Sequence, residues 1–462
     1  MILKVKKISN IGGTVKAPPS KSYTHRAIII ASLSEGVSKL YDPLLSEDTL
    51  ASVNVCRIFG ADIDTSNFYS IGNHPNSNSF WKITGVNGRE GLENSSKGNI
   101  DLKNSGTTLR IMTSVACLAK NGAVFTGDDS LKTRPMTMLL EALKPLGGNA
   151  KSLMDNGKPP IATEPGFVGG VTSIDGNVSS QFISSLLIAG AISKEGINLE
   201  VKGDFISKSY VAMTLDVMEK FGVEIDSDLF TKHENCEMLD KKCSSTSFSI
   251  KPQKYKATDY VIEGDYSSAS YLLGAVAILG GKIVVKNLFE GSKQGDKLIL
   301  EILEMMGAKI EINHDSVTLI SDGNLKGIDI DLHNAPDLLP TVSTLGALAN
   351  GKTTIFGVKH ARYKETDRIA KCGEELSKLG CKIKENEDGM EIIGGINLEE
   401  SGSNKVTSHD DHRLAMAFSL IALKHDILIE NGDVFNVSFP NFIEAMAEIG
   451  IELGLFDECC IL

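Results

Sequence analysis

Six copies of one local pattern run through the 462-residue chain, and this repetition constrains its fold more than any other feature. Each copy is an amphipathic helix, an apolar residue followed by glycine, and a short strand, as in LDVMEKFGVEID and LEILEMMGAKIEI. Each glycine stands where a helix needs a left-handed residue before the chain turns into a strand. From one copy to the next, these glycines are 70 to 87 residues apart. They are Gly60, Gly147, Gly222, Gly307, Gly380 and Gly450.

A second series of six segments alternates with the first. These segments are rich in small and apolar residues, as is typical of helices that are buried on most sides. Most of them run into a turn and then a β-branched strand, such as KIVVKNL after Gly281. The repeating unit is therefore a strand–helix–strand–helix–strand block of about 77 residues. Six such blocks predict an α/β fold with partly parallel sheets, and the chain length predicts two or three domains.

Residues 346–353, GALANGKT, match the phosphate-binding loop of nucleotide-binding proteins and raise an ATP-binding alternative. In such a loop a strand comes first and a helix follows, so that the helix N-terminus meets the phosphate. Here the expected order is reversed, because helix 337–349 precedes the loop and the strand TTIFGV follows it. We therefore interpret Asn350, Gly351 and Lys352 as a helix stop and a strand start.

Composition excludes several classes of protein. A net charge of −12 argues against a general nucleic-acid or membrane-surface binder. No apolar run reaches the roughly 20 residues of a membrane span, and MILKVKKISN does not resemble a signal peptide. We expect a cytoplasmic protein whose cysteines are scattered reduced thiols, without a disulfide framework or zinc site. The cysteines are Cys56, Cys117, Cys236, Cys243, Cys372, Cys381, Cys459 and Cys460.

Polar and charged residues gather at the N-terminal ends of the six buried helices. If the repeats place equivalent ends on one side, the six ends face one region, each with unpaired amides and roughly half a positive charge. Ser, Thr, Asn and Asp at these ends are also explained as ordinary N-caps. Lys21, Arg26 and Arg413 are not, because the helix dipole repels cations there. We therefore predict a site for strongly anionic small molecules. The groups are Ser20–Ser22 with Arg26, Asn104–Thr108 with Arg110, Ser179–Gln181, Asp265 with Ser267–Ser268, Asp337, and Asp411–Arg413.

Two further segments add cations: TGDDSLKTRPM contains Lys132 and Arg134, and HARYKETDRIA is densely charged. A charge run is usually a solvated helix face, but we favour a functional role for Lys364, Glu365 and Arg368, since they add to a cationic site. The segment HDDHR suggests a metal site. Its residues are nearly consecutive, however, which is poor geometry for joint ligation of one ion, and we expect no metal.

Together these motifs resemble the EPSP synthase family of enolpyruvyl transferases over nearly the whole chain. The family's architecture is a two-domain inside-out α/β barrel with three βαβαββ blocks per domain. The resemblance implies one discontinuous domain of residues 1–20 and 258–462, and a second domain of residues 21–257. The motifs, in the family's order, are APPSKSYTHRA, KNSGTTLR, TGDDSLKTRPM, SSQFISSLL, SKSYVAMTLDVM, EGDYSSASY, KETDR and HDDHRLAMAF.

The resemblance also implies an activity, namely transfer of the enolpyruvyl group of phosphoenolpyruvate to the 5-hydroxyl of shikimate 3-phosphate. Phosphate is released by addition and elimination, and no metal or organic cofactor is required. The expected partners are these two small molecules, with no nucleic acid and no membrane, and the expected state is a monomer.

The residues that match the family's motifs carry expected roles. Asp337 accepts the hydroxyl proton, Glu365 protonates the methylene carbon, and Lys21 contacts both substrates. The residues expected to bind shikimate 3-phosphate are Lys21, Ser22, Arg26, Ser179, Ser180, Gln181, Ser207, Tyr210, Asp337, His360 and Lys364. Those expected to bind phosphoenolpyruvate are Lys21, Gly106, Arg134, Gln181, Arg368 and Arg413.

The chain departs from the family's pattern in places. Val437 stands where many bacterial members have Lys, His360 where Asn is common, and Ile111 where Pro is frequent. The nearest alternative is the sister transferase that acts on UDP-N-acetylglucosamine. That enzyme has Lys-Asn in place of Lys21-Ser22 and usually a cysteine in its phosphoenolpyruvate loop, whereas no cysteine lies near Arg134 here. A non-catalytic anion-binding module is a further alternative, but it would not need Asp337 and Glu365.

Overall fold

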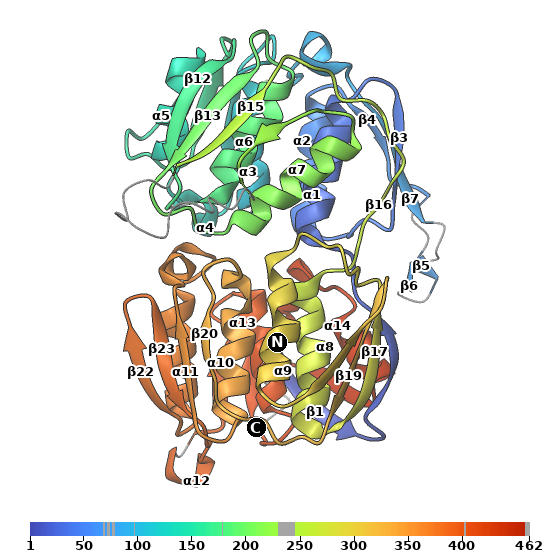
Figure 1. The fold of residues 1–462 in the computed structure, drawn as a ribbon, viewed down its shortest axis with the longest axis vertical. Helices are drawn as coiled ribbons and strands as arrows, with labels where there is room; N and C mark the ends of the chain where they lie inside the picture. The colour runs from blue at the N-terminus through green and yellow to red at the C-terminus, as the bar shows by residue number, and fades with distance from the viewer. Residues whose placement is uncertain are drawn as a thin grey trace. The chain divides into compact units, whose positions relative to one another are not determined.

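A computed structural model describes residues 1–67, 70–71, 74–75, 79–96, 98–177, 179–229, 245–401 and 403–457. The chain divides into two compact units, each with its own hydrophobic core. Unit 1 comprises Met1–Ser20 and Glu263–Leu462, and unit 2 comprises Lys21–Ile262 (Figure 1). The return to unit 1 falls five residues after the expected boundary, because β16 (Tyr260–Val261) still pairs with β3 (Val37–Tyr41) of unit 2.

The described residues of unit 2 form three four-stranded sheets, each with one parallel strand pair and two antiparallel pairs, and a small antiparallel pair of β5 (Ser70–Ile71) and β6 (His74–Pro75). The strand orders are β16-β3-β7-β4, β8-β9-β11-β10 and β12-β13-β15-β14. The further strands are β4 (Asp62–Asp64), β7 (Phe80–Thr84), β8 (Asn99–Asp101), β9 (Ala123–Thr126), β10 (Asn149–Ser152), β11 (Ile161–Glu164), β12 (Gly170–Asp175), β13 (Ile197–Lys202), β14 (Asp226–Ser227) and β15 (Thr246–Ile250). The helices are α1 (Lys21–Leu33), α2 (Glu47–Ile58), α3 (Gly106–Ala116), α4 (Asp129–Lys132), α5 (Thr137–Leu143), α6 (Ser180–Ala191) and α7 (Lys208–Lys220).

Unit 1 repeats this plan with sheets β2-β17-β19-β18, β20-β21-β23-β22 and β24-β25-β1-β26. Figure 1 shows α8, α10 and α13 in the middle of the unit, with sheets at its margins. The strands are β1 (Ile2–Ile8), β2 (Gly12–Lys16), β17 (Gly281–Lys286), β18 (Lys309–Ile312), β19 (Ser316–Ser321), β20 (Asp329–Asp331), β21 (Lys352–Phe356), β22 (Lys382–Asn386), β23 (Gly389–Ile393), β24 (Lys405–Thr407), β25 (Leu428–Glu430) and β26 (Ile451–Phe456). The helices are α8 (Tyr266–Leu279), α9 (Ile299–Met305), α10 (Leu339–Leu348), α11 (Arg368–Lys378), α12 (Leu398–Ser401), α13 (His412–Ile421) and α14 (Phe442–Glu448).

Six sheets of this kind confirm the predicted α/β class and its six βαβαββ blocks. Three blocks are completed by strands from distant parts of the chain. β2 pairs with β17 in the block of α8, β16 pairs with β3 in the block of α1, and β1 lies between β25 and β26 in the block of α13. The chain therefore enters unit 2 and returns from it without leaving a sheet incomplete.

All six repeat glycines have positive φ angles, which confirms the prediction of left-handed residues after the amphipathic helices. Gly450, for example, follows α14 with φ +89°, and a Cβ atom there would lie 2.4 Å from the carbonyl oxygen of Asn10. A side chain at this position would meet both the unfavourable φ and that backbone.

The second helix series is buried, as expected. Nearly all residues of α8, α6 and α13 are shielded from solvent. Small hydroxyl residues let these helices pack closely and form hydrogen bonds with one another. Ser114 of α3, for example, is hydrogen-bonded to Ser185 of α6 at 2.6 Å. Ser270 of α8 and Thr341 of α10 make the corresponding contact in unit 1 at 3.0 Å. Buried hydroxyls that find partners cost little, so these contacts allow the helices to pack closely.

The GALANGKT segment has the reversed order that was predicted. α10 ends at Leu348, within the segment, and β21 begins at Lys352, whose Nζ pairs with Glu391 on the neighbouring strand at 3.2 Å. The segment lies at a helix C-terminus, so it lacks the amide cradle of a phosphate-binding loop.

The cysteines within the described residues, Cys56, Cys117, Cys372 and Cys381, are buried free thiols. Burial raises the pKa of Cys56 to about 12 and that of Cys381 to about 11, so these thiols are unreactive. Cys236, Cys243, Cys459 and Cys460 lie outside the described residues. Among the helices that the structure describes, none is long and apolar enough to span a bilayer.

Candidate functional site

Several of the expected residues of unit 2 lie at the N-terminal ends of its buried helices α1, α3 and α6. Lys21 is the first residue of α1 and Gly106 is the first residue of α3. Ser179 caps α6 by accepting a hydrogen bond from the N–H of Gln181 at 3.3 Å, and Ser180 begins the helix. Because helix N-termini present unpaired N–H groups and partial positive charge, these ends are suited to anions.

Lys21 already has a carboxylate neighbour. Its Nζ lies 3.1 Å from Asp48 of α2, and both side chains are largely buried. His25, whose Nδ1 is 2.8 Å from Ser52 Oγ, faces the same carboxylate at 3.5 Å. Burial disfavours the Asp48 charge, but Lys21 and His25 outweigh it and hold the Asp48 pKa well below its usual range. Asp48 therefore orients Lys21 and offsets part of its charge.

Arg26 contacts two other expected residues of unit 2, Ser22 and Tyr210. It is 1% exposed and donates to the Ser22 carbonyl at 2.8 Å, the Tyr210 carbonyl at 3.0 Å and Thr214 Oγ1 at 2.8 Å. All of these acceptors are neutral, and burial lowers the pKa of Arg26 to about 10. The guanidinium remains charged near neutral pH, and it holds α1 against α7, next to Ser207, which has a left-handed φ of +55°.

Gly106 and Arg134 are in direct contact. A Cβ on Gly106 would lie 2.5 Å from Arg134 Nη1, while Arg134 Nη2 donates to Asn104 Oδ1 at 2.6 Å. Arg134 is 8% exposed. The absence of a side chain at Gly106 thus lets a guanidinium cover the start of α3.

Gln181 joins the starts of α3 and α6. Its Nε2 donates to Thr107 Oγ1 at 2.8 Å, and its Oε1 accepts from Arg110 Nη1 at 2.5 Å. Arg110 also stacks over the Phe182 ring, with 5.3 Å between the guanidinium carbon and the ring centroid. These contacts orient Gln181 relative to Arg110.

In unit 1 the expected residues form a network around Arg368. This guanidinium is 1% exposed and donates at 2.7 Å to each of Asp411, Asp337 and Glu365. Burial alone would lower the Arg368 pKa, but the three carboxylates raise it above the ordinary value. Arg368 is therefore permanently charged and fixes the positions of both expected catalytic carboxylates.

Asp337 is also held by two further cations. Arg413 Nη2 donates to its Oδ2 at 2.9 Å, and Lys364 Nζ lies 3.4 Å from its Oδ1. Asp337 lies in the 3₁₀ helix η4 (Pro336–Leu338), which leads into α10, while Arg413 is the second residue of α13. The start of α11, the start of α13 and η4 are thereby brought to one place.

His360 lies beside this network in η5 (Lys359–Tyr363), with 8% of its surface exposed. Burial, together with the nearby Lys364 and His333, lowers the pKa of His360 to about 3. It is therefore a neutral hydrogen-bonding group near neutral pH and adds no charge for an anion.

The HDDHR residues have separate partners. His409 lies 2.7 Å from Glu375, Asp410 accepts from Asn431 at 3.3 Å, and Asp411 pairs with Arg368. The donor atoms of Glu374, Glu375 and His409 do come within 4.8 Å of one another. Glu375 is also bonded by Lys378 and by the N–H of Thr407, so its oxygens already have donors without an ion.

Two carboxylates of these clusters are not among the expected residues. Asp48 lies in the first turn of α2, where acidic residues are common, and Asp296 follows a glycine in the 3₁₀ helix η3 (Gly295–Leu298) before α9. Neither position has a local signal, because each carboxylate faces residues that are distant in sequence.

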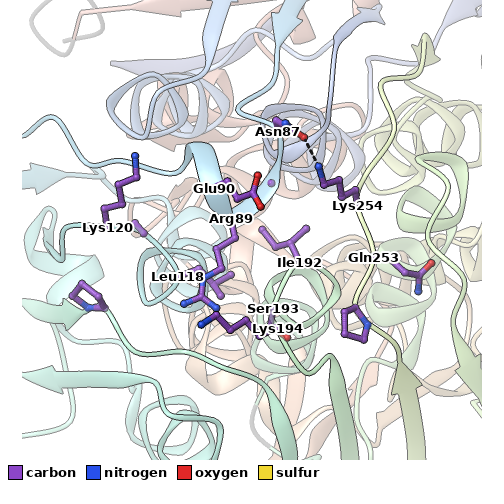
Figure 2. A pocket seen from close by; sticks show the side chains of 14 residues that line it. Asn87, Arg89, Glu90, Leu118, Lys120, Ile192, Ser193, Lys194, Gln253 and Lys254 are labelled. Atoms are coloured by element: carbon purple, nitrogen blue, oxygen red, sulfur yellow. Dashed lines mark hydrogen bonds between the residues drawn. The ribbon is translucent and has the colours of Figure 1, made fainter.

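A cavity of about 610 Å³ opens elsewhere in unit 2 (Figure 2). Its apolar side contains Leu118 and Ile192, just beyond the C-terminal ends of α3 and α6, and Figure 2 shows Arg89, Lys194 and Lys254 around it. In the described part of the chain, no expected site residue lines this cavity.

Comparisons with known proteins agree with these motifs. The family model for EPSP synthase (3-phosphoshikimate 1-carboxyvinyltransferase) matches residues 5–446. A 3-phosphoshikimate 1-carboxyvinyltransferase of Methanobrevibacter smithii is 60% identical, over 98% of this chain and 100% of the relative. Another, from Methanothermobacter thermautotrophicus, is 51% identical over the same shares.

A solved structure of EPSP synthase from Acinetobacter baumannii matches 98% of this chain and 100% of its own, with 26% identity and a TM-score of 0.74. The fold, the motifs and the relatives lead to one conclusion. The chain belongs to the EPSP synthase (3-phosphoshikimate 1-carboxyvinyltransferase) family.

Proposed function

We propose that this protein is a transferase that moves the enolpyruvyl group of phosphoenolpyruvate to the 5-hydroxyl of shikimate 3-phosphate and releases phosphate. Family membership supports this activity. The observation that carries it is the placement of Asp337 and Glu365 on one buried guanidinium, that of Arg368. An anion-binding module has no use for two carboxylates in such a position, whereas an addition–elimination reaction needs a base and an acid.

In the proposed addition step, Asp337 takes the proton of the 5-hydroxyl, whose oxygen bonds to C2 of phosphoenolpyruvate. The methylene carbon receives a proton from Glu365, so a tetrahedral ketal phosphate forms. In the elimination step the C2–O bond to phosphate breaks, the departing phosphate takes the proton held by Asp337, and the new methyl group loses a proton to Glu365. All atoms are accounted for by the two carboxylates and the two substrates.

The cations account for binding. The residues proposed for phosphoenolpyruvate include Gly106, Arg134 and Gln181 of unit 2 and Arg368 and Arg413 of unit 1, with Lys21 touching both substrates. Anionic groups of the substrate would compete with Asp337 for Arg368 and Arg413. Such competition would release the Asp337 carboxylate toward the hydroxyl.

The residues proposed for shikimate 3-phosphate follow the same logic. Helix N-termini and a guanidinium are suited to a phosphate ester, and hydroxyl groups suit a sugar-like ring. We assign Lys21, Ser22, Arg26, Ser179, Ser180, Gln181, Ser207, Tyr210, Asp337, His360 and Lys364 to this substrate.

The deciding experiment mixes the protein with phosphoenolpyruvate and shikimate 3-phosphate, without ATP or added metal, and follows inorganic phosphate. We expect release that requires both substrates and is lost in Glu365→Gln. Release only with UDP-N-acetylglucosamine would favour the sister transferase, and release only with ATP would favour a kinase. No release under any condition would refute enolpyruvyl transfer.

A further inference from the structure

Asp296 is a buried carboxyl of unit 1 to which the proposed reaction assigns no role. It lies in η3 (Gly295–Leu298) before α9 and is 4% exposed. It accepts a hydrogen bond from Ser267 Oγ in the first turn of α8. Its other oxygen, Oδ1, is shielded from solvent and has no hydrogen-bond partner among the described residues.

The groups around Asp296 belong to the candidate active site. Asp337 faces it from η4, Arg413 from α13, and Asp265 from the N-cap of α8. On the remaining packed element, α9, the charged residues Glu301 and Glu304 are exposed to solvent. Asp296 forms no ion pair within 4.0 Å in the described part of the chain. The charged groups that act on it are the carboxylates of Asp337 and Asp265 and the guanidinium of Arg413, which also pairs with Asp337.

Such surroundings favour the protonated carboxyl. A buried carboxylate with one unsatisfied oxygen and no paired cation is costly. Burial raises the pKa of Asp296 to about 7, the Asp337 charge acts in the same direction, and Arg413 acts against it. The group therefore changes charge near neutral pH beside the cation that we assign to phosphoenolpyruvate.

We propose that Asp296 is a positioning residue that, as a neutral acid held on Ser267, leaves the charge of Arg413 available to the phosphoenolpyruvate anion. This inference rests on the proposed function. If Asp296 loses its proton, a second negative charge appears next to Asp337 and Arg413. That charge attracts Arg413 away from the substrate and repels the substrate anion.

The test compares KM for phosphoenolpyruvate in the wild type and in Asp296→Asn from pH 6 to pH 8.5. The amide has nearly the shape of the neutral acid but cannot ionise. The substrate phosphates titrate equally with both proteins, so the ratio of the two KM values removes their contribution. We expect the ratio of wild type to variant to rise by roughly 5- to 10-fold with pH, as for a change of one nearby charge, while kcat of the variant changes little.

Two further variants keep the test decisive. Ser267→Ala removes a hydrogen bond that favours the ionised form, so the rise in KM should begin at a higher pH than in the wild type. Asp315→Asn, at an exposed aspartate of unit 1, should leave the profile unchanged. Ser267→Ala alone tests the inference if Asp296→Asn does not fold.

Three outcomes would overturn the proposal. A ratio that stays constant with pH would show that Asp296 has only a structural role. A loss of kcat in Asp296→Asn at pH 6 by 100-fold or more, the range of general acid–base catalysis, would place it in the chemistry instead. If the dependence of KM on pH is the same in Ser267→Ala as in the wild type, the hydrogen bond from Ser267 does not influence the charge of Asp296. Absence of phosphate release by the wild type would instead count against the proposed function.

Discussion

Arg26 of unit 2 and Arg368 of unit 1 are equally buried, at 1% exposure each, yet their surroundings differ. Arg26 donates to neutral oxygens and has a lowered pKa, whereas Arg368 donates to three carboxylates and has a raised one. Among the described residues of unit 2, no carboxylate pairs with the buried charge of Arg26, which suits the binding of an anion. In unit 1 the charge of Arg368 is compensated by carboxylates, and an anion must compete with Asp337 for Arg368 and Arg413. Such competition would free the Asp337 carboxylate, as a reaction that needs a base requires.

The most severe test of this comparison is Asp337→Asn. Loss of a general base should lower kcat by about 10²- to 10⁴-fold. Phosphoenolpyruvate binding should be kept or strengthened, since one competitor for Arg368 and Arg413 loses its charge. Steady-state phosphate release and calorimetric titration measure the two effects, with Asp315→Asn as the exposed control. Near-normal turnover would remove Asp337 from the proposed chemistry.

A second test replaces Arg26 and Arg368 by methionine, one at a time, and measures the free energy of unfolding in urea. Arg368→Met leaves three carboxylates without their shared cation and should cost about 3–5 kcal/mol. Arg26→Met leaves neutral acceptors unsatisfied and should cost about 1–3 kcal/mol. Equal losses would show that the two arginines have the same structural role and would end the comparison.

Gly106→Ala tests whether unit 2 mainly serves binding. The added methyl would lie 2.5 Å from Arg134 Nη1 and push this guanidinium aside. Displacement of a binding group by about 1 Å costs up to about 100-fold, and we expect this mainly in KM for phosphoenolpyruvate. Gly98→Ala is the matched control, because a Cβ there meets nothing within 4 Å. An unchanged KM would argue against the assignment of Gly106 and Arg134.

The smallest effect is expected outside both clusters, at Lys352. Its exposed pair with Glu391 should be worth at most about 1 kcal/mol. Lys352→Ala should therefore keep turnover within roughly twofold of the wild type, since it neither binds substrate nor holds the fold. Loss of activity together with loss of ATP binding would restore the nucleotide-binding alternative.

Features that depend on neighbours in the sequence could be predicted. The six glycines, the helices that end before them and the polar starts of the buried helices all follow from local rules of helix termination and capping. The reversed order around Lys352 follows in the same way. Lys21 and Arg413 also indicate an anion site from the sequence alone, because a cation at a helix start is unfavourable by itself.

The partners of these residues could not be predicted, because side-chain pairing depends on which blocks the fold brings together. Asp48 reaches Lys21 from the next helix, and Asp296 faces Asp337 and Arg413 across 41 and 117 positions of sequence. Their acidic side chains look like ordinary helix-turn and loop residues in the sequence.

The sequence by itself determined the six-block α/β plan and the positions of the cations, since periodicity, glycine conformation and the helix dipole act over a few residues. Only the tertiary structure decided which charges are compensated. Electrostatic energies depend on distances and burial that arise when separate blocks pack. The sequence indicates that Arg26 and Arg368 are both cations of one site. The structure shows that Arg26 is surrounded by neutral acceptors, whereas Arg368 is surrounded by carboxylates.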